Sequence, residues 1–402
     1  MRDVGVVMPV YKQNPLYLEM ALRSVLEQSY KHFYFVIVSD GAPQEANDVI
    51  HNVTNGDPRI HFILKEKNQG VAKALNIGFD YLMEIEEVNY LTWVSSDNIY
   101  YDTYLEKLRN ALETAPDNVG LSYSSFKYID AKGDYLKDPQ LGEFYKYQNQ
   151  PKENLLDVCF IGVSFMYKKH FAAMIDGYKM EPVEDYEYWL RMTDHCEILY
   201  IPEMLMEYRT NSPLSVSVQL RNSKSQHRRW RYAFNLARFE ARNRRNIPFK
   251  LTVIYPVEEG SEKTIVKLEE LFEQTFSNYK LIIIDRSIDR EAINVLQHIE
   301  DPRVKFIELP GATEMEAILL GINDADTPYT LILGKGVFPS SPFVLYNMIL
   351  NQQQLNQSIE NRYITSFDSG KGVVSIYSIH QQKIPNYGTL YLTEELEKIL
   401  DH

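Results

Sequence analysis

The sequence predicts an α/β protein: a parallel sheet with helices on both faces, then a helical linker and a second, degenerate α/β domain. Two patterns along the chain favour this fold class. Short apolar runs alternate with segments of helical periodicity through the first half. The last third then repeats the first at lower fidelity. We expect domain boundaries at 1–216, 217–247 and 248–402.

The first half supplies the elements of that sheet in order. Apolar, β-branched runs mark the strands, and leucine and alanine at intervals of three or four residues mark the helices. We expect strands over 3–11, 34–43, 59–64 and from 90 toward 97, and helices over 18–26, 45–53 and 71–83. Because ligands bind beyond the carboxyl ends of parallel strands, residues that follow these strands are the first candidates for a site.

Three acidic residues stand out at such positions. Asp40 ends the second strand beside Gly41, Asp97 ends the fourth, and Asp185 lies in EPVEDYEYWLRM. Asp40 can accept hydrogen bonds from a pyrimidine base or a ribose hydroxyl. Asp97 can bind Mg²⁺ or Mn²⁺ with phosphate and water completing the shell. Asp185 can take a proton from an attacking hydroxyl.

Each acid alone has a simpler explanation. An Asp that follows a strand is more often a turn or a helix cap. Glu184 and Asp185 also precede an aromatic run and could cap a helix. The order of the three acids on an alternating α/β pattern favours the functional interpretation.

Composition excludes several classes of protein. A length of 402 residues indicates two or three domains, and the net charge of −13 argues against general nucleic-acid binding. Cys159 and Cys196 are the two cysteines, too few for a disulfide framework or a zinc site. No apolar run reaches the roughly 18–20 residues of a membrane helix, and the chain starts on a strand. We therefore expect a cytoplasmic protein.

The segment 221–245 concentrates positive charge. It carries nine Lys or Arg residues against the single acid Glu240, with Trp230, Phe234 and Ala237 at helical spacing. The simpler interpretation is an amphipathic packing helix with a solvated basic face. The alternative is a surface for peripheral contact with anionic lipid or a phosphorylated acceptor.

Six motifs in order resemble a family 2 glycosyltransferase, an inverting enzyme with the GT-A fold. The similarity covers roughly residues 4–215. The similar segments are VVMPVYKQ, ALRSVLEQSYKHFYFVIVSDGA, KNQGVAKALNIGFDYL, VSSDNIYYDTYLEKL, EDYEYWLRM and YRTNSPLS. The DNIY sequence is also similar to the spore-coat polysaccharide branch of the family.

The resemblance implies a role for each matching position. Asp185 would be the general base, and Asp97 would hold Mn²⁺ or Mg²⁺. Glu184 and Trp189 would bind the acceptor. The nucleotide would contact Pro9, Val10, Tyr11, Asp40, Asn68, Lys73, Ser96 and Asp97. The implied reaction moves a sugar from a nucleotide sugar, expected to be a UDP-sugar, to a hydroxyl of a saccharide or cell-surface polysaccharide.

Three positions depart from the family pattern. Ser39 and Ser96 stand where family members carry an acid, and Asn211 stands where they often carry a histidine. These changes weaken the expected metal site more than the expected fold.

The repeat at the C-terminal end aligns LTVIYPVEEG with the opening strand and YTLILGKGVFPS with YLTWVSSDNIYY. Gly336 then takes the place of Asp97, and Lys335 that of Ser96. A cation and two glycines cannot supply a metal ligand set, so we expect this copy to be inactive. It would pack, form a homodimer contact or position the acceptor. A solvated loop lysine is the expected state of Lys335, and direct binding of an anion is the alternative.

Three other functions compete with an active transferase. A catalytically impaired nucleotide-sugar-binding or scaffold protein on the same fold is the first alternative, because of Ser39, Ser96 and the degenerate repeat. Sugar nucleotidyltransferases resemble one another in an early Gly-x-Gly-x-Arg loop that is missing around Met8–Lys12. A dehydrogenase would need G-x-G-x-x-G after the first strand.

Overall fold

The structure is a computed structural model that describes residues 2–136, 148–210, 220, 222–355, 363–367, 374–378 and 386–400. The chain forms two compact units, the N-terminal unit (residues 1–237) and the C-terminal unit (residues 238–402). The finer division at 216 and 247 stays a prediction. Among the described helices, none combines the length and apolar character needed to cross a membrane.

Strands and helices alternate in the N-terminal unit, as the sequence predicts. Its elements are β1 (Val4–Val10), α1 (Pro15–Leu26), β2 (Phe33–Asp40), α2 (Gln44–Thr54), β3 (Ile60–Lys65), α3 (Val71–Met83), β4 (Tyr90–Trp93), β5 (Ile99–Tyr100), α4 (Tyr104–Thr114), β6 (Val119–Ile129), η1 (Lys152–Leu156), β7 (Phe165–Lys168), α6 (Lys169–Ala172), α7 (Glu184–Met192) and β8 (Glu197–Arg209). Local sequence signals fix the start of α1. Asn14 caps α1 by accepting a hydrogen bond from the backbone N–H of Leu16, and Pro15 begins that helix.

The eight strands of this unit form one sheet in the order β3-β2-β1-β4-β7-β6-β8-β5. The first four run parallel, as predicted, but β7 and β5 pair antiparallel to their neighbours. The sheet is therefore mixed. The sequence did not reveal this because β6 to β8 lack the regular strand–helix alternation from which parallel pairing is inferred.

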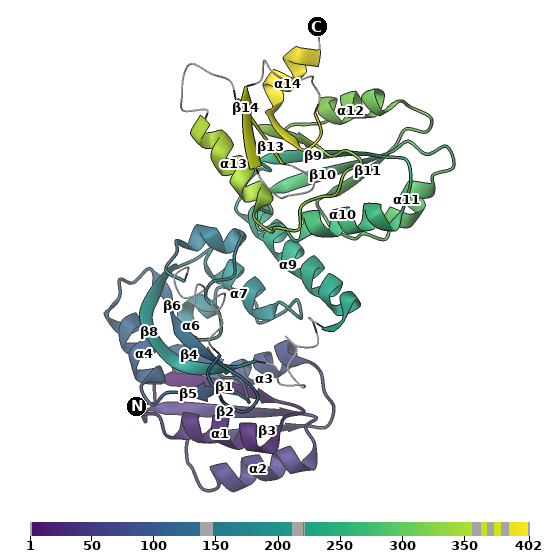
Figure 1. Cartoon of the computed structure of the whole chain (residues 1–402). Helices are drawn as coiled ribbons and strands as arrows, with labels where there is room; N and C mark the ends of the chain where they lie inside the picture. Colours follow the sequence, from purple (N-terminus) through teal and green to yellow (C-terminus); the bar gives the residue numbers. More distant parts are fainter. Residues whose placement is uncertain are drawn as a thin grey trace. The chain divides into compact units, whose positions relative to one another are not determined.

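Helices cover both faces of the parallel strands (Figure 1). On one face, α1 and α4 pack over the alternate residues Val4 and Met8 of β1. On the other face lies α3, where a methyl group added at Gly78 would lie 2.5 Å from Val7. The predicted doubly covered sheet is confirmed.

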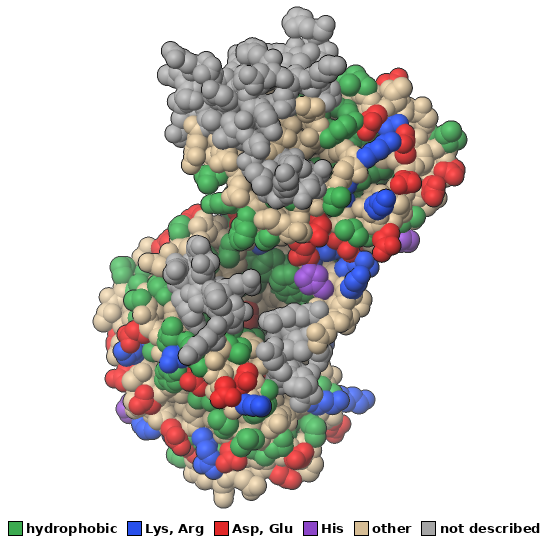
Figure 2. All heavy atoms as spheres, viewed as in Figure 1, with side chains coloured by type: hydrophobic (Ala, Val, Ile, Leu, Met, Phe, Trp, Pro, Cys, Tyr) green, Lys and Arg blue, Asp and Glu red, His purple; other side chains and the backbone are tan. Residues whose placement is uncertain are grey.

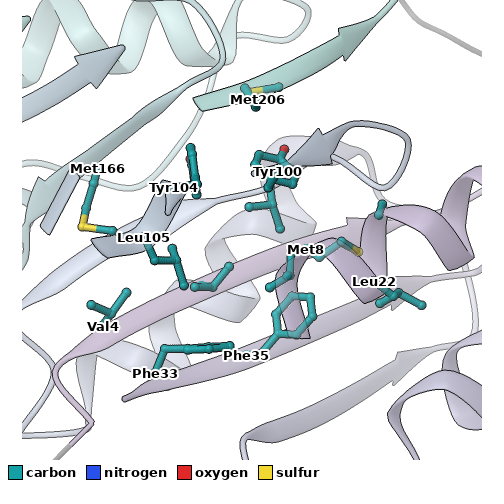
Figure 3. Close-up of a cluster of buried hydrophobic side chains, with 14 of the residues drawn as sticks. Val4, Met8, Leu22, Phe33, Phe35, Tyr100, Tyr104, Leu105, Met166 and Met206 are labelled. Carbon is teal, nitrogen blue, oxygen red and sulfur yellow. The ribbon is translucent and has the colours of Figure 1, made fainter. Parts of the chain in front are cut away.

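A buried apolar cluster holds the strands that carry the candidate site (Figure 3). Phe33 and Phe35 of β2 lie with Leu22 of α1, and both phenylalanine side chains are fully buried. Tyr104 of α4 joins the same cluster. Each large side chain removed from water in this way contributes roughly 1.5–3 kcal/mol, so the strand ends are held on a rigid base.

The C-terminal unit repeats the first half of this architecture (Figure 1). Its elements are β9 (Leu251–Val257), α10 (Glu262–Phe272), β10 (Tyr279–Asp285), α11 (Glu291–Leu296), β11 (Val304–Glu308), α12 (Glu314–Asn323), β12 (Tyr329–Ile332), α13 (Val344–Leu355), β13 (Tyr363–Phe367), β14 (Val374–Ser378), β15 (Thr389–Leu392) and α14 (Thr393–Leu400). The strand order is β11-β10-β9-β12-β15-β13-β14. Parallel β11-β10-β9-β12 matches parallel β3-β2-β1-β4, and the next strand is antiparallel in both sheets. The predicted second, degenerate α/β domain is therefore present.

The basic segment forms α9 (Lys224–Arg244), which confirms the predicted helix. Its basic residues are not all solvated. Arg242 is buried, and its Nη1 donates a hydrogen bond of 3.0 Å to Ser277 Oγ. Phe234 stacks on Tyr186 at 4.1 Å between ring centroids. Packing thus accounts for part of the segment, and lipid contact through the remainder stays a prediction.

Candidate functional site

Asp40, at the carboxyl end of β2, organises the loop that leads into α3. Its Oδ2 accepts hydrogen bonds from Asn68 Nδ2 at 2.9 Å, Gln69 N at 2.9 Å and Gly70 N at 3.0 Å. The structure therefore joins Asp40 and Asn68, two residues predicted at the site. Three donors bind this one carboxylate, and Gln69 N also donates to Oδ1, so the first role of Asp40 is to hold this loop.

Two glycines make this close packing possible. Gly41 has φ +66°, and a Cβ there would lie 2.5 Å from the backbone nitrogen of Asn68. Gly70 has φ +98°, and a Cβ there would lie 2.5 Å from Glu181 Oε1. Glu181 Oε1 also accepts a hydrogen bond of 2.8 Å from Ala72 N at the start of α3. The loop is thus bound to a residue that lies four positions before Asp185.

Asp97 lies in the loop between β4 and β5. Ser95 Oγ donates a 2.6 Å hydrogen bond to Asp97 Oδ1, and Gln13 Nε2 donates one of 3.3 Å to Ser96 Oγ. Burial raises the pKa of the Asp97 carboxyl, although the Ser95 hydroxyl and the charge of Arg209 oppose the shift. A cation bound next to Asp97 would lower the pKa of its carboxyl again and favour the ionised form.

The residues around Asp97 fit a divalent cation that takes most of its ligands from phosphate and water. Within the described part of the chain, no group of three His, Cys, Asp or Glu side chains could hold a metal ion. Mg²⁺, and by its preference for oxygen Mn²⁺, needs only one or two carboxylates when phosphates and water complete the shell. Asp97 alone therefore fits a cation that arrives with a phosphate-bearing ligand.

Arg209, the last residue of β8, reaches the same loop. Its Nε donates 3.0 Å to the carbonyl of Asp97, its backbone N–H donates 3.0 Å to Asn98 Oδ1, and its guanidinium lies 4.1 Å from the centroid of the Tyr17 ring. Nη2 is buried and has no hydrogen-bond partner among the described residues. The Nη2 group of Arg209, close to the Asp97 loop, is thus a candidate hydrogen-bond donor to an anionic group.

Glu184 and Asp185 open α7, where negative charge suits the helix N-terminus. Part of each residue reaches the surface, but Glu184 Oε2 and Asp185 Oδ1 are buried without a hydrogen-bond partner in the described structure. Burial raises the pKa of Glu184 to about 7. Burial and then the charge of Glu184 raise the pKa of Asp185 well above its usual range, and the Trp93 indole opposes this shift.

Aromatic rings extend into the core from Trp93, the residue whose indole acts on the pKa of Asp185. Trp93, at the end of β4, lies 6.0 Å from Phe165, which in turn lies 4.4 Å from Trp189 between ring centroids. Trp189 is fully buried. Its side chain lies in the core in this structure, and its contact with an acceptor stays a prediction.

The remaining predicted residues take separate positions. Pro9 and Val10 end β1, Val10 being buried, whereas Tyr11 is 40% exposed. Lys73 is exposed on the first turn of α3, and the described contacts do not join it to Asp40 or Asp97. Asn211 lies outside the described residues.

Sequence reasoning missed Gln13, Ser95, Trp93 and Glu181. Gln13, Ser95 and Glu181 stand inside VVMPVYKQ, VSSDNIYYDTYLEKL and EPVEDYEYWLRM, but no spacing encodes their contacts with Ser96, Asp97 and Ala72. Arg209 does stand in the YRTNSPLS segment, so its motif was visible although its orphan guanidinium nitrogen was not.

The raised pKa of Glu184 predicts how stability changes with pH. In the native state Glu184 keeps its proton up to about pH 7, whereas the unfolded chain releases it near 4.5. Protons bound only by the native state stabilise it at low pH, so this contribution falls as pH rises through that interval, by about 3 kcal/mol at most. Urea unfolding at pH 5 and pH 8 should therefore show a smaller loss of stability in Glu184→Gln than in the wild type.

Glu66→Gln is the matched control for this comparison, because Glu66 is exposed. It should keep the pH dependence of the wild type. Equal pH dependence in Glu184→Gln and the wild type would show that Glu184 ionises as freely as it does in the unfolded chain.

Carboxylates and backbone donors at the carboxyl ends of parallel strands define an α/β domain of the nucleotide-binding class. Comparison with protein families gives the particular family. Residues 5–174 match the model of glycosyl transferase family 2. The matched residues lie within the N-terminal unit, which is therefore similar to the glycosyltransferases of family 2.

Curated relatives carry the same family description. An uncharacterized glycosyltransferase of Rickettsia conorii is 25% identical, across 93% of this chain and 68% of the relative. One from Methanocaldococcus jannaschii is 28% identical, across 51% of this chain and 70% of the relative. A third, from Haemophilus influenzae, is 28% identical across 33% of this chain and 51% of its own length. The rickettsial alignment thus extends through both units.

Solved structures are more distant. A mannosyltransferase from Pyrobaculum calidifontis, in complex with GDP-Man and Mn²⁺, is 15% identical with a TM-score of 0.44, across 60% of this chain and 64% of that one. TarS 1–349 from S. aureus, in complex with UDP, is 12% identical with a TM-score of 0.45, across 74% of this chain and 90% of that one.

Proposed function

We propose that the N-terminal unit transfers a sugar from a nucleotide sugar, expected to be a UDP-sugar, to a hydroxyl of a saccharide or cell-surface polysaccharide with inversion. The observation that carries this proposal is Asp185, whose buried Oδ1 has no hydrogen-bond partner among the described residues, near Trp93 at the end of β4. The family match supports the same reaction class. Inversion follows from a single displacement at the anomeric carbon.

Asp185 is the base in this proposal. A carboxylate with a raised pKa holds a proton more tightly, which suits removal of a proton from an attacking hydroxyl near neutral pH. Glu184 assists because its charge contributes to that shift. Trp93 and Trp189 exclude water from one side of the pair and keep Asp185 oriented.

Asp97 and Arg209 serve the leaving group. Asp97 would hold Mg²⁺ or Mn²⁺, which when bound neutralises the diphosphate as a Lewis acid. The orphan Nη2 of Arg209 adds a fixed positive charge from the protein itself. This donor compensates in part for Ser96, which stands in the place of an acid.

Asp40 shapes the nucleotide pocket indirectly, through the loop that it holds. It fixes Asn68 and the 69–70 backbone, and that loop borders the carboxyl end of the sheet where the base and ribose would lie. Pro9, Val10 and Tyr11 would line the base from the end of β1. A direct hydrogen bond from Asp40 to the base stays a prediction.

Nucleoside diphosphates tested with and without Mn²⁺ provide the experiment. One of them should raise the melting temperature of the full chain only when Mn²⁺ is present. Asp97 gives the metal few protein ligands, so metal and diphosphate are expected to bind together. At a ligand concentration of about 100 times Kd the native state gains roughly 2.7 kcal/mol. Hydrolysis of the matching nucleotide sugar is then measured as turnover.

A catalytically impaired binding or scaffold protein is the second candidate. Ser39 and Ser96 in acidic positions favour it, together with the lack of a three-residue metal cluster in the described ranges. Stabilisation by a nucleotide without turnover of any nucleotide sugar would establish this alternative. A chain that no nucleotide stabilises, with or without metal, would contradict both candidates.

A further inference from the structure

The C-terminal unit contains a cavity of about 860 Å³ whose place in the fold is that of a ligand site. It is lined by residues at or just beyond the carboxyl ends of three parallel strands: Val257 of β9, Arg286 after β10 and Lys335 after β12. The strand order changes direction between β9 and β12, and open α/β sheets bind ligands at such a point. An adjoining cavity of about 250 Å³ shares Lys267 and Lys335 with it.

Lys267 on α10 is a buried cation that faces both cavities. It is 5% exposed, its Nζ lies 4.7 Å from the centroid of the Tyr255 ring, and it donates a hydrogen bond to the carbonyl of Gly334. An ammonium group has three donors, and no ion pair to Lys267 is found among the described residues. Burial lowers its pKa to about 8, so the group is still largely charged at neutral pH. A buried ammonium without a carboxylate is a position for an anion.

Two further cations come to the same cavity. Arg286 Nη2 forms an ion pair with Glu258 Oε1, and Lys335 Nζ lies 3.4 Å from Glu258 Oε2. Glu258 is half-exposed and Lys335 is 82% exposed, so both side chains can rearrange at little cost. Lys267, Arg286 and Lys335 thus bring three positive charges to the cavity, although its whole lining holds four cations and five carboxylates. A phosphoryl group would lie against these cations.

The other residues that line the cavity limit the chemistry of a ligand that carries this phosphoryl group. Four more glutamates and one lysine border the cavity: Glu259, Glu262, Glu291, Glu314 and Lys263. Figure 2 shows acidic and basic side chains interspersed over the end of the unit that carries α10 and α11. These carboxylates repel a ligand with several negative charges and accept hydrogen bonds from hydroxyl groups. Gly336 in the place of Asp97 offers no side-chain metal ligand.

We propose that this cavity binds a sugar phosphate without a metal ion. The phosphoryl group lies against Lys267, Arg286 and Lys335, and the sugar hydroxyls donate to the surrounding glutamates. The volume lies within the range of small-molecule sites. The proposal gives the C-terminal unit a ligand of its own and does not depend on catalysis in the N-terminal unit.

Isothermal titration calorimetry on the full chain in EDTA tests this inference. The probes are glucose 1-phosphate, N-acetylglucosamine 1-phosphate, inorganic phosphate and glucose. At least one sugar phosphate should bind saturably, with inorganic phosphate about tenfold weaker or more and glucose giving no measurable heat. No saturable binding by either sugar phosphate, or binding that requires a divalent ion, would overturn the proposal.

Variants locate the binding. Lys267→Met, of similar length, should weaken it by about 10- to 100-fold, the effect of losing a charge-assisted hydrogen bond. Lys335→Met should weaken it only a few-fold, and the exposed control Lys250→Met should not change it. Unchanged affinity in Lys267→Met would overturn the proposal. If circular dichroism shows that Lys267→Met does not fold, Arg286→Gln replaces it and is judged in the same way.

Asp97→Ala separates this proposal from the proposed transferase. It alters the N-terminal unit, so sugar phosphate binding to the C-terminal unit should persist unchanged. Loss of binding in Asp97→Ala with normal binding in Lys267→Met would place the sugar phosphate in the N-terminal unit and overturn the inference. Failure of transferase activity leaves the titration result unaffected.

Discussion

Asp185→Asn is expected to lower the rate of sugar transfer by about 10²- to 10⁴-fold, the contribution usual for a positioned general base. Asparagine keeps the size and shape of aspartate but cannot accept the proton of the acceptor hydroxyl. Nucleotide affinity should stay near that of the wild type, because this side chain does not contact the Asp97 loop in the described structure. Transfer rates and nucleotide binding, measured on the same preparation, check this expectation.

Stability gives an internal control for the same variant. Burial disfavours the charged form of Asp185, so the neutral asparagine should leave the melting temperature at pH 8 unchanged or higher. A loss of activity could then not be ascribed to unfolding. Asp80→Asn, an exposed Asp on α3, should transfer at the wild-type rate. Wild-type transfer in Asp185→Asn would show that another group removes the proton.

The parallel half of each sheet could be predicted because its signals are local. The 71–83 helix agrees with α3 at both ends, since its apolar periodicity begins directly after Gly70. The repeat placed β9 and β12 correctly from residue patterns alone. The antiparallel strands β7 and β5 could not be placed, because their pairing depends on contacts with β4 and β8 that no local pattern encodes.

The candidate site divides in the same way. Asp40, Asp97 and Asp185 were visible because strand ends and a motif mark them. Their surroundings were not visible. The Asp40 carboxylate accepts hydrogen bonds from a loop about thirty residues later in the chain, and the Trp189 side chain lies in the core. The fully buried state of Trp189 follows from packing against Phe165, which a single sequence does not specify.

Asp97→Ala is expected to abolish the metal-dependent part of nucleotide binding and to lower transfer by about 10²- to 10³-fold or more, a loss typical of removing charge stabilisation from a reaction centre. The effect should be large because Asp97 belongs to no group of three His, Cys, Asp or Glu side chains that could hold a metal ion within the described residues. Melting temperatures with nucleotide, with and without Mn²⁺, measure the binding term separately from turnover.

Two further variants make the result specific. Asp102→Ala removes an exposed acid from the next connection along the chain, between β5 and α4, and should leave the Mn²⁺ effect intact. Asp97→Asn retains an oxygen for the Ser95 hydroxyl bond but lacks the charge, so it should resemble Asp97→Ala if the metal requires the carboxylate. Should Mn²⁺ still raise the melting temperature of Asp97→Ala with nucleotide by the wild-type amount, the cation is held elsewhere. Arg209, whose buried Nη2 has no hydrogen-bond partner among the described residues, would then be a positive charge that the protein offers the diphosphate.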